Sequence, residues 1–131
     1  MKNLILGYTR GRNKWHGFSE ALKSIGQHVD LAIDKFDNIN DKYDRIWSMA
    51  ESMLPLQAEL EEKWGIKNIS KDAASILTNK KKLDDFVVDL MPSIIPNSVI
   101  PTCLEDLDIF GDGAFCIKPV IGSGGKQSYD T

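Results

Sequence analysis

The first half of the chain switches between strand-like and helix-like hydrophobic periods. An apolar run at residues 4–8 ends in a glycine-containing turn, which is typical of a buried strand that opens a parallel sheet. Apolar residues then recur every three or four positions until Gly26, which can adopt the left-handed conformation that ends a helix. Residues 28–36 alternate instead, and this pattern predicts a half-exposed strand at the outside of the sheet.

The same strand-helix order then repeats. A short apolar run at residues 44–49 predicts a third strand, and Pro55 and Gly65 mark the start and the end of the helix that follows. We therefore expect residues 1–69 to form an α/β domain with a small open parallel sheet and flanking helices.

Shorter elements follow, and residues 70–131 predict a partial α+β subdomain. Ser70 is placed to cap a helix, a second helix should follow the lysine run at residues 80–82, and a glycine-rich segment lies at residues 122–125. The elements expected in between are a strand at 98–102, a short helix at 104–110 and a strand at 114–119. The boundary between the two parts should fall between residues 69 and 79.

Composition and charge narrow the possible functions. Of 131 residues, 42% are hydrophobic and 27% are charged, which is typical of a soluble globular protein. The net charge of -3 supplies no positive field to hold a nucleic acid. The N-terminal apolar run is too short for a signal peptide or a membrane span, so a cytoplasmic protein without membrane association is expected.

The cysteines and histidines predict no metal site. Cys103 and Cys116 fit neither a CxxC motif nor a zinc-ligand spacing, and His16 and His28 lack clustered partners. We expect both cysteines to be buried or inert thiols.

A lysine and a glycine-rich loop near the end of the chain indicate an anion site. Lys118 ends an apolar strand, where a buried ammonium group needs a negative partner. A loop rich in glycine can aim its backbone N–H groups at phosphate oxygens. The residues of this loop are Gly122, Ser123, Gly124 and Gly125. From the residues alone, a plain hairpin with a solvated lysine is the alternative.

Two other nucleotide-binding motifs do not match. A P-loop needs Gly where Val120 stands and Ser or Thr where Gln127 stands. The turn after the first strand lacks the third glycine of the dinucleotide motif, although Asp34 lies near the position of a ribose-binding acid. A nicotinamide-binding protein is therefore a minor alternative.

Taken together and in order, several segments resemble the ATP-grasp superfamily. These segments are GIKNISKDAA at residues 65–74, Thr78-Asn79-Lys80, the interval from Pro96 to Pro101, and Ile117-Lys118-Pro119 with its glycine loop. The similarity is greatest to carboxylate-amine ligases of the amino-acid ligase, D-alanine ligase and biotin-carboxylase-like groups. It implies a pre-ATP-grasp domain at residues 1–69 and an incomplete first ATP-grasp subdomain at residues 70–131.

The resemblance assigns roles to individual residues. It implies that Lys80 contacts the α-phosphate of ATP, that Lys118 bridges the α- and β-phosphates, and that residues 122–125 close over the triphosphate. Asn79 and Lys67 stand where the family has aspartate and proline, so Lys81 stays open as the alternative to Lys80. Without the resemblance, the lysine run would be interpreted as a solvated helix face.

The implied reaction joins a carboxylate to an amine or a thiol through an acylphosphate, with ATP and Mg²⁺. Charge neutralisation and positioning drive such a reaction. The family's magnesium ligands follow the glycine loop, so we expect this chain to be an N-terminal fragment that is inactive alone. The sequence leaves a homo-oligomer open.

Weaker candidates lie at the carboxyl ends of the predicted strands, where open α/β sheets bind ligands. They are Thr9, Arg10 and Arg12 after the first strand and Glu51 after the third, as contacts for a small-molecule substrate. A charge at a helix terminus explains Glu51 equally well. A non-catalytic ligand- or protein-binding α/β module is the main alternative function.

Overall fold

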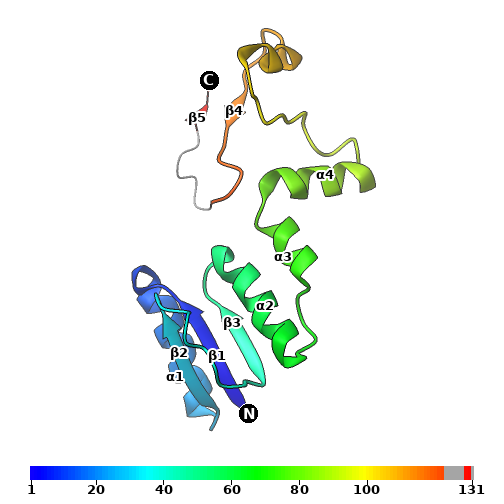
Figure 1. The fold of residues 1–131 in the computed structure, drawn as a ribbon. Coiled ribbons are helices and arrows are strands. Elements are labelled where there is room, and N and C mark those ends of the chain that lie inside the picture. Colours follow the sequence, from blue (N-terminus) through cyan, green and yellow to red (C-terminus); the bar gives the residue numbers. More distant parts are fainter. Residues whose placement is uncertain (123–128, 131) are drawn as a thin grey trace. The chain divides into compact units, whose positions relative to one another are not determined.

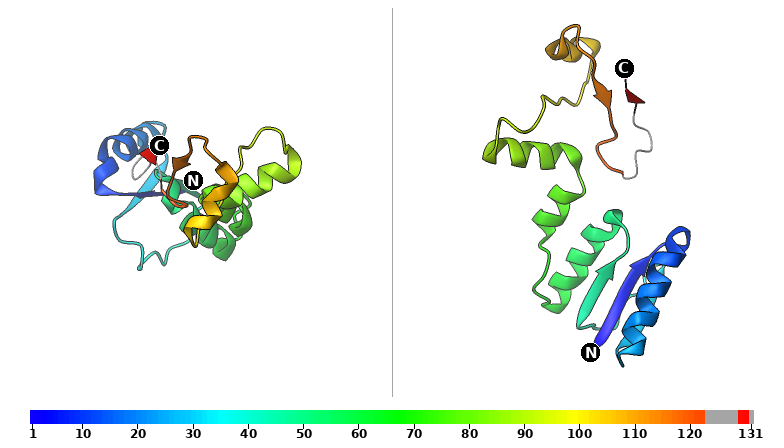
Figure 2. Two further views of the ribbon diagram at one scale, coloured as in Figure 1. Left: turned by 90° about the horizontal axis from the view of Figure 1, so that it is seen from above. Right: turned by 180° about the vertical axis from the view of Figure 1, so that it is seen from behind.

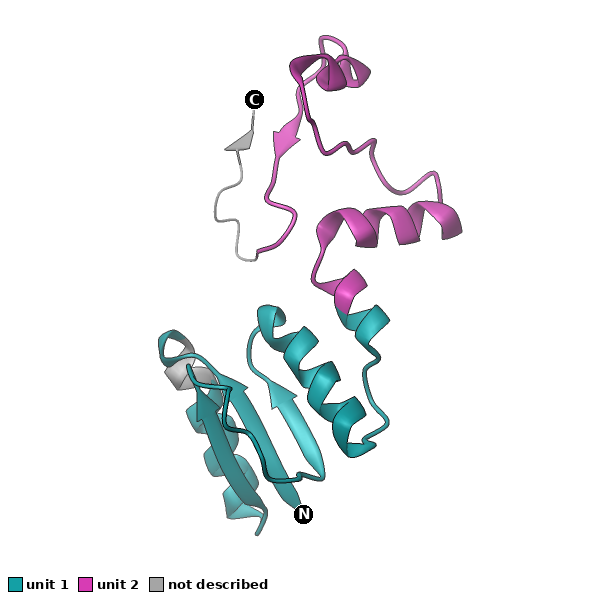
Figure 3. Cartoon of the chain, viewed as in Figure 1, with its two compact units in different colours: residues 1–74 teal, residues 75–131 magenta. Residues whose placement is uncertain are grey.

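The computed structural model describes residues 1–122 and 129–130, with the side chains of residues 1–10 and 15–122. The chain divides into two compact units, residues 1–74 and 75–131 (Figures 1 and 3). The division falls after Ala74, whose side chain is fully buried, and so lies between residues 69 and 79.

Unit 1 contains a three-stranded parallel sheet in the order β2-β1-β3. Its elements are β1 (Lys2–Gly7), η1 (Thr9–Gly11), α1 (Arg12–Ser24), β2 (His28–Ile33), β3 (Arg45–Ser48), η2 (Glu51–Met53), α2 (Leu54–Trp64) and most of α3 (Lys71–Leu77). The predicted α/β architecture with a small parallel sheet and flanking helices is confirmed, including the outer position of β2.

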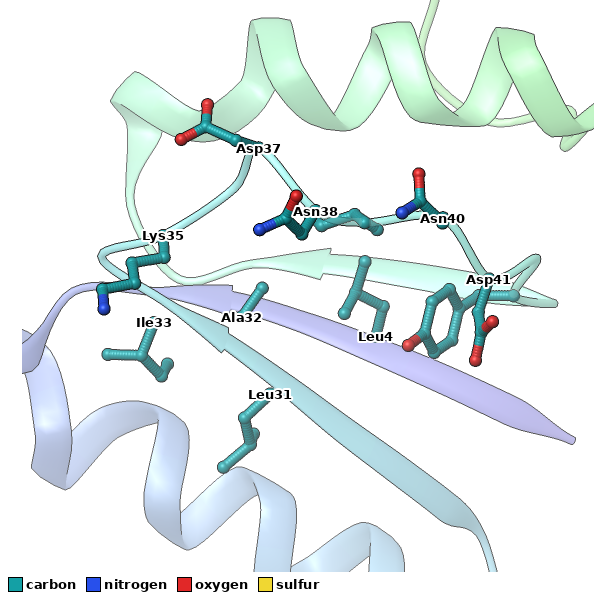
Figure 4. A pocket seen from close by; sticks show the side chains of 11 residues that line it. Leu4, Leu31, Ala32, Ile33, Lys35, Asp37, Asn38, Asn40 and Asp41 are labelled. Carbon is teal, nitrogen blue, oxygen red and sulfur yellow. The ribbon is translucent and has the colours of Figure 1, made fainter.

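The central strand β1 is buried on both faces of the sheet. Leu4 and Leu6 contribute to a core with Ile46 of β3. Met53 of η2 and Leu60 of α2 complete this part of the core. Since side chains alternate along a strand, the intervening residues of β1 face α1. Figure 2 shows α1 lying across the β1–β2 side of the sheet, and Figure 4 shows α1 and α2 on opposite faces.

One buried side chain connects all three strands. Asn3 of β1 is 1% exposed, and its Oδ1 accepts a hydrogen bond from Trp47 Nε1 of β3 at 3.1 Å. Its Nδ2 donates to the carbonyl of His28 at 3.1 Å and to Gln27 Oε1 at 3.3 Å. Because both ends of the amide are bonded, the burial of this polar group is compensated.

The ends of α2 follow from its sequence. Pro55 lies in the first turn, and Gly65 adopts a φ of 71° at the carboxyl end, where its N–H donates to the carbonyl of Glu62. Residues 66–69 form a loop, and Ser70 Oγ then accepts from the backbone N–H of Ala73, as expected for the cap of α3.

Unit 2 contains short elements with little burial. They are α4 (Lys80–Leu90), η3 (Leu104–Phe110), β4 (Cys116–Ile117) and β5 (Tyr129–Asp130), and the two strands pair antiparallel. The strand expected at 98–102 is wrong: among the described residues no strand lies beside this segment, and prolines interrupt it. The strand expected at 114–119 is reduced to two residues.

The helices of the described part are short or polar. None of them combines the length with the apolar composition that crossing a membrane requires.

Candidate functional site

Unit 2 brings the start of α4 to the glycine-rich segment. The backbone N–H of Lys80 donates to the carbonyl of Val120 at 2.9 Å, and Lys80 Nζ donates to the carbonyl of Gly122. Asn79 holds the helix start in place, since its Oδ1 accepts from the N–H of Lys82 at 3.0 Å. Two segments that the resemblance assigns to one nucleotide site are therefore adjacent.

The three neighbouring lysines have different partners. Lys81 forms an ion pair with Asp85 one turn further along α4, and Lys82 Nζ donates to Ser75 Oγ at 2.7 Å. In the described part of the chain no carboxylate pairs with Lys80, which is half-buried. The geometry thus distinguishes Lys80 from Lys81 as the ammonium group next to the glycine segment.

The expected burial of Lys118 is wrong. Lys118 directly follows β4 and is exposed, and Ile117 before it is 51% exposed. A strand of two residues with one short neighbour is too small to cover a side chain, so desolvation does not force an anion onto this lysine. Among the side chains that the structure describes, none forms an ion pair with Lys118.

The glycine loop is described only at its first residue. Gly122 is exposed and has a φ of 137°, a backbone conformation that residues other than glycine rarely adopt. Ser123, Gly124 and Gly125 lie outside the described residues. The antiparallel pairing of β4 with β5 shows that a strand follows this loop, which agrees with the rejection of a P-loop and also fits the plain hairpin.

The candidates at the carboxyl end of the parallel sheet are only partly free to bind. Thr9 donates from its backbone N–H, at 3.1 Å, and from its hydroxyl to the carboxylate of Asp34, which follows β2 with a φ of 58°. This carboxylate is therefore engaged, contrary to what a ribose-binding acid requires. Arg10 and Glu51 are exposed after β1 and β3. Arg12 begins α1, and its side chain lies outside the described part.

A polar cluster at the opposite end of the sheet has no counterpart in the sequence analysis. Tyr43 donates its hydroxyl to Asp30 Oδ2 at 2.9 Å, and His28 Nε2 lies 3.2 Å from Asp30 Oδ1. Burial and then the bond to Asp30 raise the pKa of Tyr43 to about 12. Burial alone would raise the pKa of Asp30, but the bonds from Tyr43 and His28 outweigh it and lower that pKa.

A hollow lies between the sheet and the loop that leads from β2 to β3 (Figure 4). Its volume is about 690 Å³, and Leu4 and Ala32 form part of its apolar floor. The charged and amide side chains of residues 35–41 lie along its rim. The hollow extends along β2, where it is lined by residues 31–33.

Sequence reasoning also missed a buried carboxylate in α2. Glu61 is 1% exposed, and its Oε1 accepts from Gln57 Nε2 at 2.8 Å and from Asn68 Nδ2 at 2.9 Å. Its Oε2 accepts from the N–H of Ile69 at 3.2 Å. Three donors compensate the burial of the charge, and two of them lie in the loop after α2, which Glu61 attaches to the helix.

No protein-family model matches this chain, and no curated protein matches it either. Over the described residues, no three His, Cys, Asp or Glu side chains come together in a way that could hold a metal ion. Cys103 and Cys116 are both exposed, which contradicts a buried position for either thiol.

Proposed function

We propose that this chain supplies the first part of the nucleotide site of an ATP-grasp ligase that joins a carboxylate to an amine or a thiol. In this proposal unit 1 corresponds to the pre-ATP-grasp domain, and unit 2 corresponds to the first part of the ATP-grasp domain. The observation that carries the proposal is the contact of Lys80 with Gly122, across 42 residues of sequence.

The partners of Lys80 suit a phosphate. The carbonyl oxygen of Gly122 is a neutral acceptor, whereas a phosphate oxygen carries negative charge and adds a direct Coulomb attraction to the Lys80 ammonium group. A phosphate oxygen at this position would therefore replace the Gly122 carbonyl as the acceptor of the Lys80 ammonium group. Lys81 is less suited to this role because Asp85 already neutralises it.

Lys118 is the second cation of the proposed site. Lys118 is exposed, so the cost of burying its charge does not by itself require an anion there. The same exposure makes the ammonium group accessible to a ligand at the start of the loop. In this proposal the two lysines neutralise the triphosphate, and the backbone of residues 122–125 positions it. Arg10, whose guanidinium is exposed after β1, is the proposed contact for the substrate carboxylate.

In the described part of the chain, no group of three His, Cys, Asp or Glu side chains could hold the proposed magnesium ions. We therefore assign no step of the reaction to a metal held by these residues. The proposed location is the cytoplasm, where ATP is available.

Calorimetric titration of the chain with ATP, with and without Mg²⁺, tests the proposal. Lys80→Met should weaken ATP binding at least tenfold, because the change removes about one charge-assisted hydrogen bond of 1.5–3 kcal/mol. Lys118→Met should weaken it in the same direction. The matched control is Lys81→Met, which should change the affinity less than twofold.

Equal effects of Lys80→Met and Lys81→Met would contradict the proposal, because they would indicate general attraction of ATP to positive charge. Absence of ATP binding by the unaltered chain would favour the alternative of a non-catalytic module, which the exposure of Lys118 also fits.

A further inference from the structure

The outer edge of β2 is free in the described part of the chain. β2 pairs with β1 on one side, and no described strand lies on its other side. The N–H groups of His28 and Asp34 donate to carbonyls of residues 1 and 7, at 3.3 and 3.1 Å. Because main-chain groups alternate in direction along a strand, those of Val29, Leu31 and Ile33 point away from β1.

The side chains of the same three residues form an apolar row. They lie on the sheet face that α1 covers, and Figure 4 shows Leu31 and Ile33 pointing toward that helix. Leu31 is 40% exposed despite its position in the middle of the strand. The hollow described above is lined by residues 31–33. Successive side chains of a strand point to opposite faces of the sheet, so only the edge of β2 brings all three residues to the same hollow.

Most of the usual protections of an edge strand are missing from β2, whose one carboxylate, Asp30, is bonded to Tyr43 of the same chain. Natural sheets protect their edges with lysine, proline, a bulge or a very short strand. β2 has the sequence HVDLAI, which contains neither lysine nor proline, and its six residues pair with β1 without a break in register. The opposite edge strand, β3, has only four residues and begins with Arg45.

We propose that β2 pairs antiparallel with β2 of a second copy of this chain, around a two-fold axis at Leu31. In this register Leu31 lies opposite Leu31 of the second copy, and Val29 lies opposite Ile33. All three outward-pointing residues then form hydrogen-bonded pairs, and the two sheets join into one of six strands.

The charges of β2 fit this register. Asp30 lies opposite Ala32, which avoids two carboxylates directly across from each other. An axis at Asp30 would place two Asp30 carboxylates opposite each other, and an axis at Ala32 would place Asp30 opposite Asp34, so both of these registers bring like charges together. An axis at Val29 or Ile33 would pair fewer of the outward-pointing residues.

The apolar row gives the second copy a reason to bind. Pairing covers Leu31 with its own counterpart and places six apolar side chains next to one another on one sheet face. A strand partner with a charged residue at the matching position would place that charge against this row. A second β2 is therefore the occupant whose sequence fits the edge.

Cross-linking tests the axis directly. In a hydrogen-bonded antiparallel pair the Cα atoms are about 5.5 Å apart, which lies within the range of a disulfide. With Cys103 and Cys116 replaced by serine, Leu31→Cys should form a disulfide-linked dimer on mild oxidation. Leu77→Cys is the matched control, since Leu77 is 47% exposed and lies in α3. Equal rates for the two variants would overturn the proposal.

Sedimentation equilibrium tests the association without a new thiol. The unaltered chain should approach the mass of two chains as its concentration rises. Leu31→Lys should weaken the association at least tenfold, and Leu77→Lys should leave it unchanged. A chain that stays monomeric at its highest soluble concentration, or an association that responds to Leu77→Lys instead, would overturn the proposal. Circular dichroism of both variants checks that the fold is retained.

Discussion

The two units of this chain have similar hydrophobic patterns but very different burial. All described residues that are buried lie within residues 1–74, and α4 and η3 contain none. Leu6 of β1 is fully buried, whereas Leu104 of η3 is 81% exposed. The difference shows that a periodic apolar pattern is sufficient to form an element, but that burial needs a second layer to pack against.

In unit 1 the parallel sheet supplies that second layer. β1 pairs on both sides and carries helices on both faces, so its apolar residues find neighbours from distant parts of the chain. In unit 2 the helix α4 is fixed at its start by the side chain of Asn79, which is a local interaction. Four substitutions, taken from the largest expected effect to the smallest, test this contrast.

The largest effect should come from truncating the sheet core. Leu6→Ala removes a fully buried side chain and should lower the free energy of unfolding of unit 1 by about 3 kcal/mol. Leu104→Ala should change it by less than about 0.5 kcal/mol. Urea denaturation followed by tryptophan fluorescence measures both, because Trp15, Trp47 and Trp64 all lie in unit 1. Equal effects would remove the contrast between the units.

The next effect should come from the buried carboxylate of α2. Glu61→Ala leaves the side-chain donors of Gln57 and Asn68 without their acceptor, and should cost about 2 kcal/mol. Its neighbour Glu62 is exposed and pairs with Lys71 at the surface. Glu62→Ala should therefore cost less than about 1 kcal/mol in the same denaturation experiment. A smaller loss for Glu61 than for Glu62 would contradict this assignment.

A smaller effect should depend on pH. The pKa of Tyr43 is raised to about 12 from an ordinary value of 10.0. The folded state therefore favours the protonated phenol, and this stabilisation is complete below pH 10 and is lost as the pH rises through 12. Tyr43→Phe should remove this part of the alkaline loss of stability, as measured by urea denaturation at several pH values. An unchanged pH dependence in Tyr43→Phe would contradict the raised pKa of Tyr43.

The smallest effect should be confined to unit 2. Asn79→Ala removes the cap of α4 and should destabilise this helix by about 1 kcal/mol. Amide hydrogen exchange of residues 80–90 should become faster, while exchange in β1 stays the same. Faster exchange in both places would show that the two units unfold together.

Local signals predicted most of the elements. Gly26 and Gly65 mark two helix ends, and both have the positive φ that only glycine adopts readily. Ser70 caps α3 as expected. The strand expected at 98–102 failed because a strand is completed by its neighbour, which a single segment of sequence does not reveal.

The candidate site was predicted in part for the same reason. The resemblance assigns Lys80 and residues 122–125 to one triphosphate, and in the structure Lys80 donates to the carbonyl of Gly122. The expected burial of Lys118 failed because the pattern of one strand does not show how much of it neighbours cover. Glu61 was missed because two of its donors belong to a loop that reaches it only in the folded chain.

The hydrogen bonds of Asn3 have a consequence for synthesis on the ribosome. Its amide is satisfied only when Gln27 and His28, at the start of β2, are in place and Trp47 has joined as part of β3, 44 positions later. Until that tryptophan leaves the exit tunnel, the nascent chain holds an incomplete sheet around a polar group that lacks one partner. The first strand to be translated is thus among the last to be fully paired.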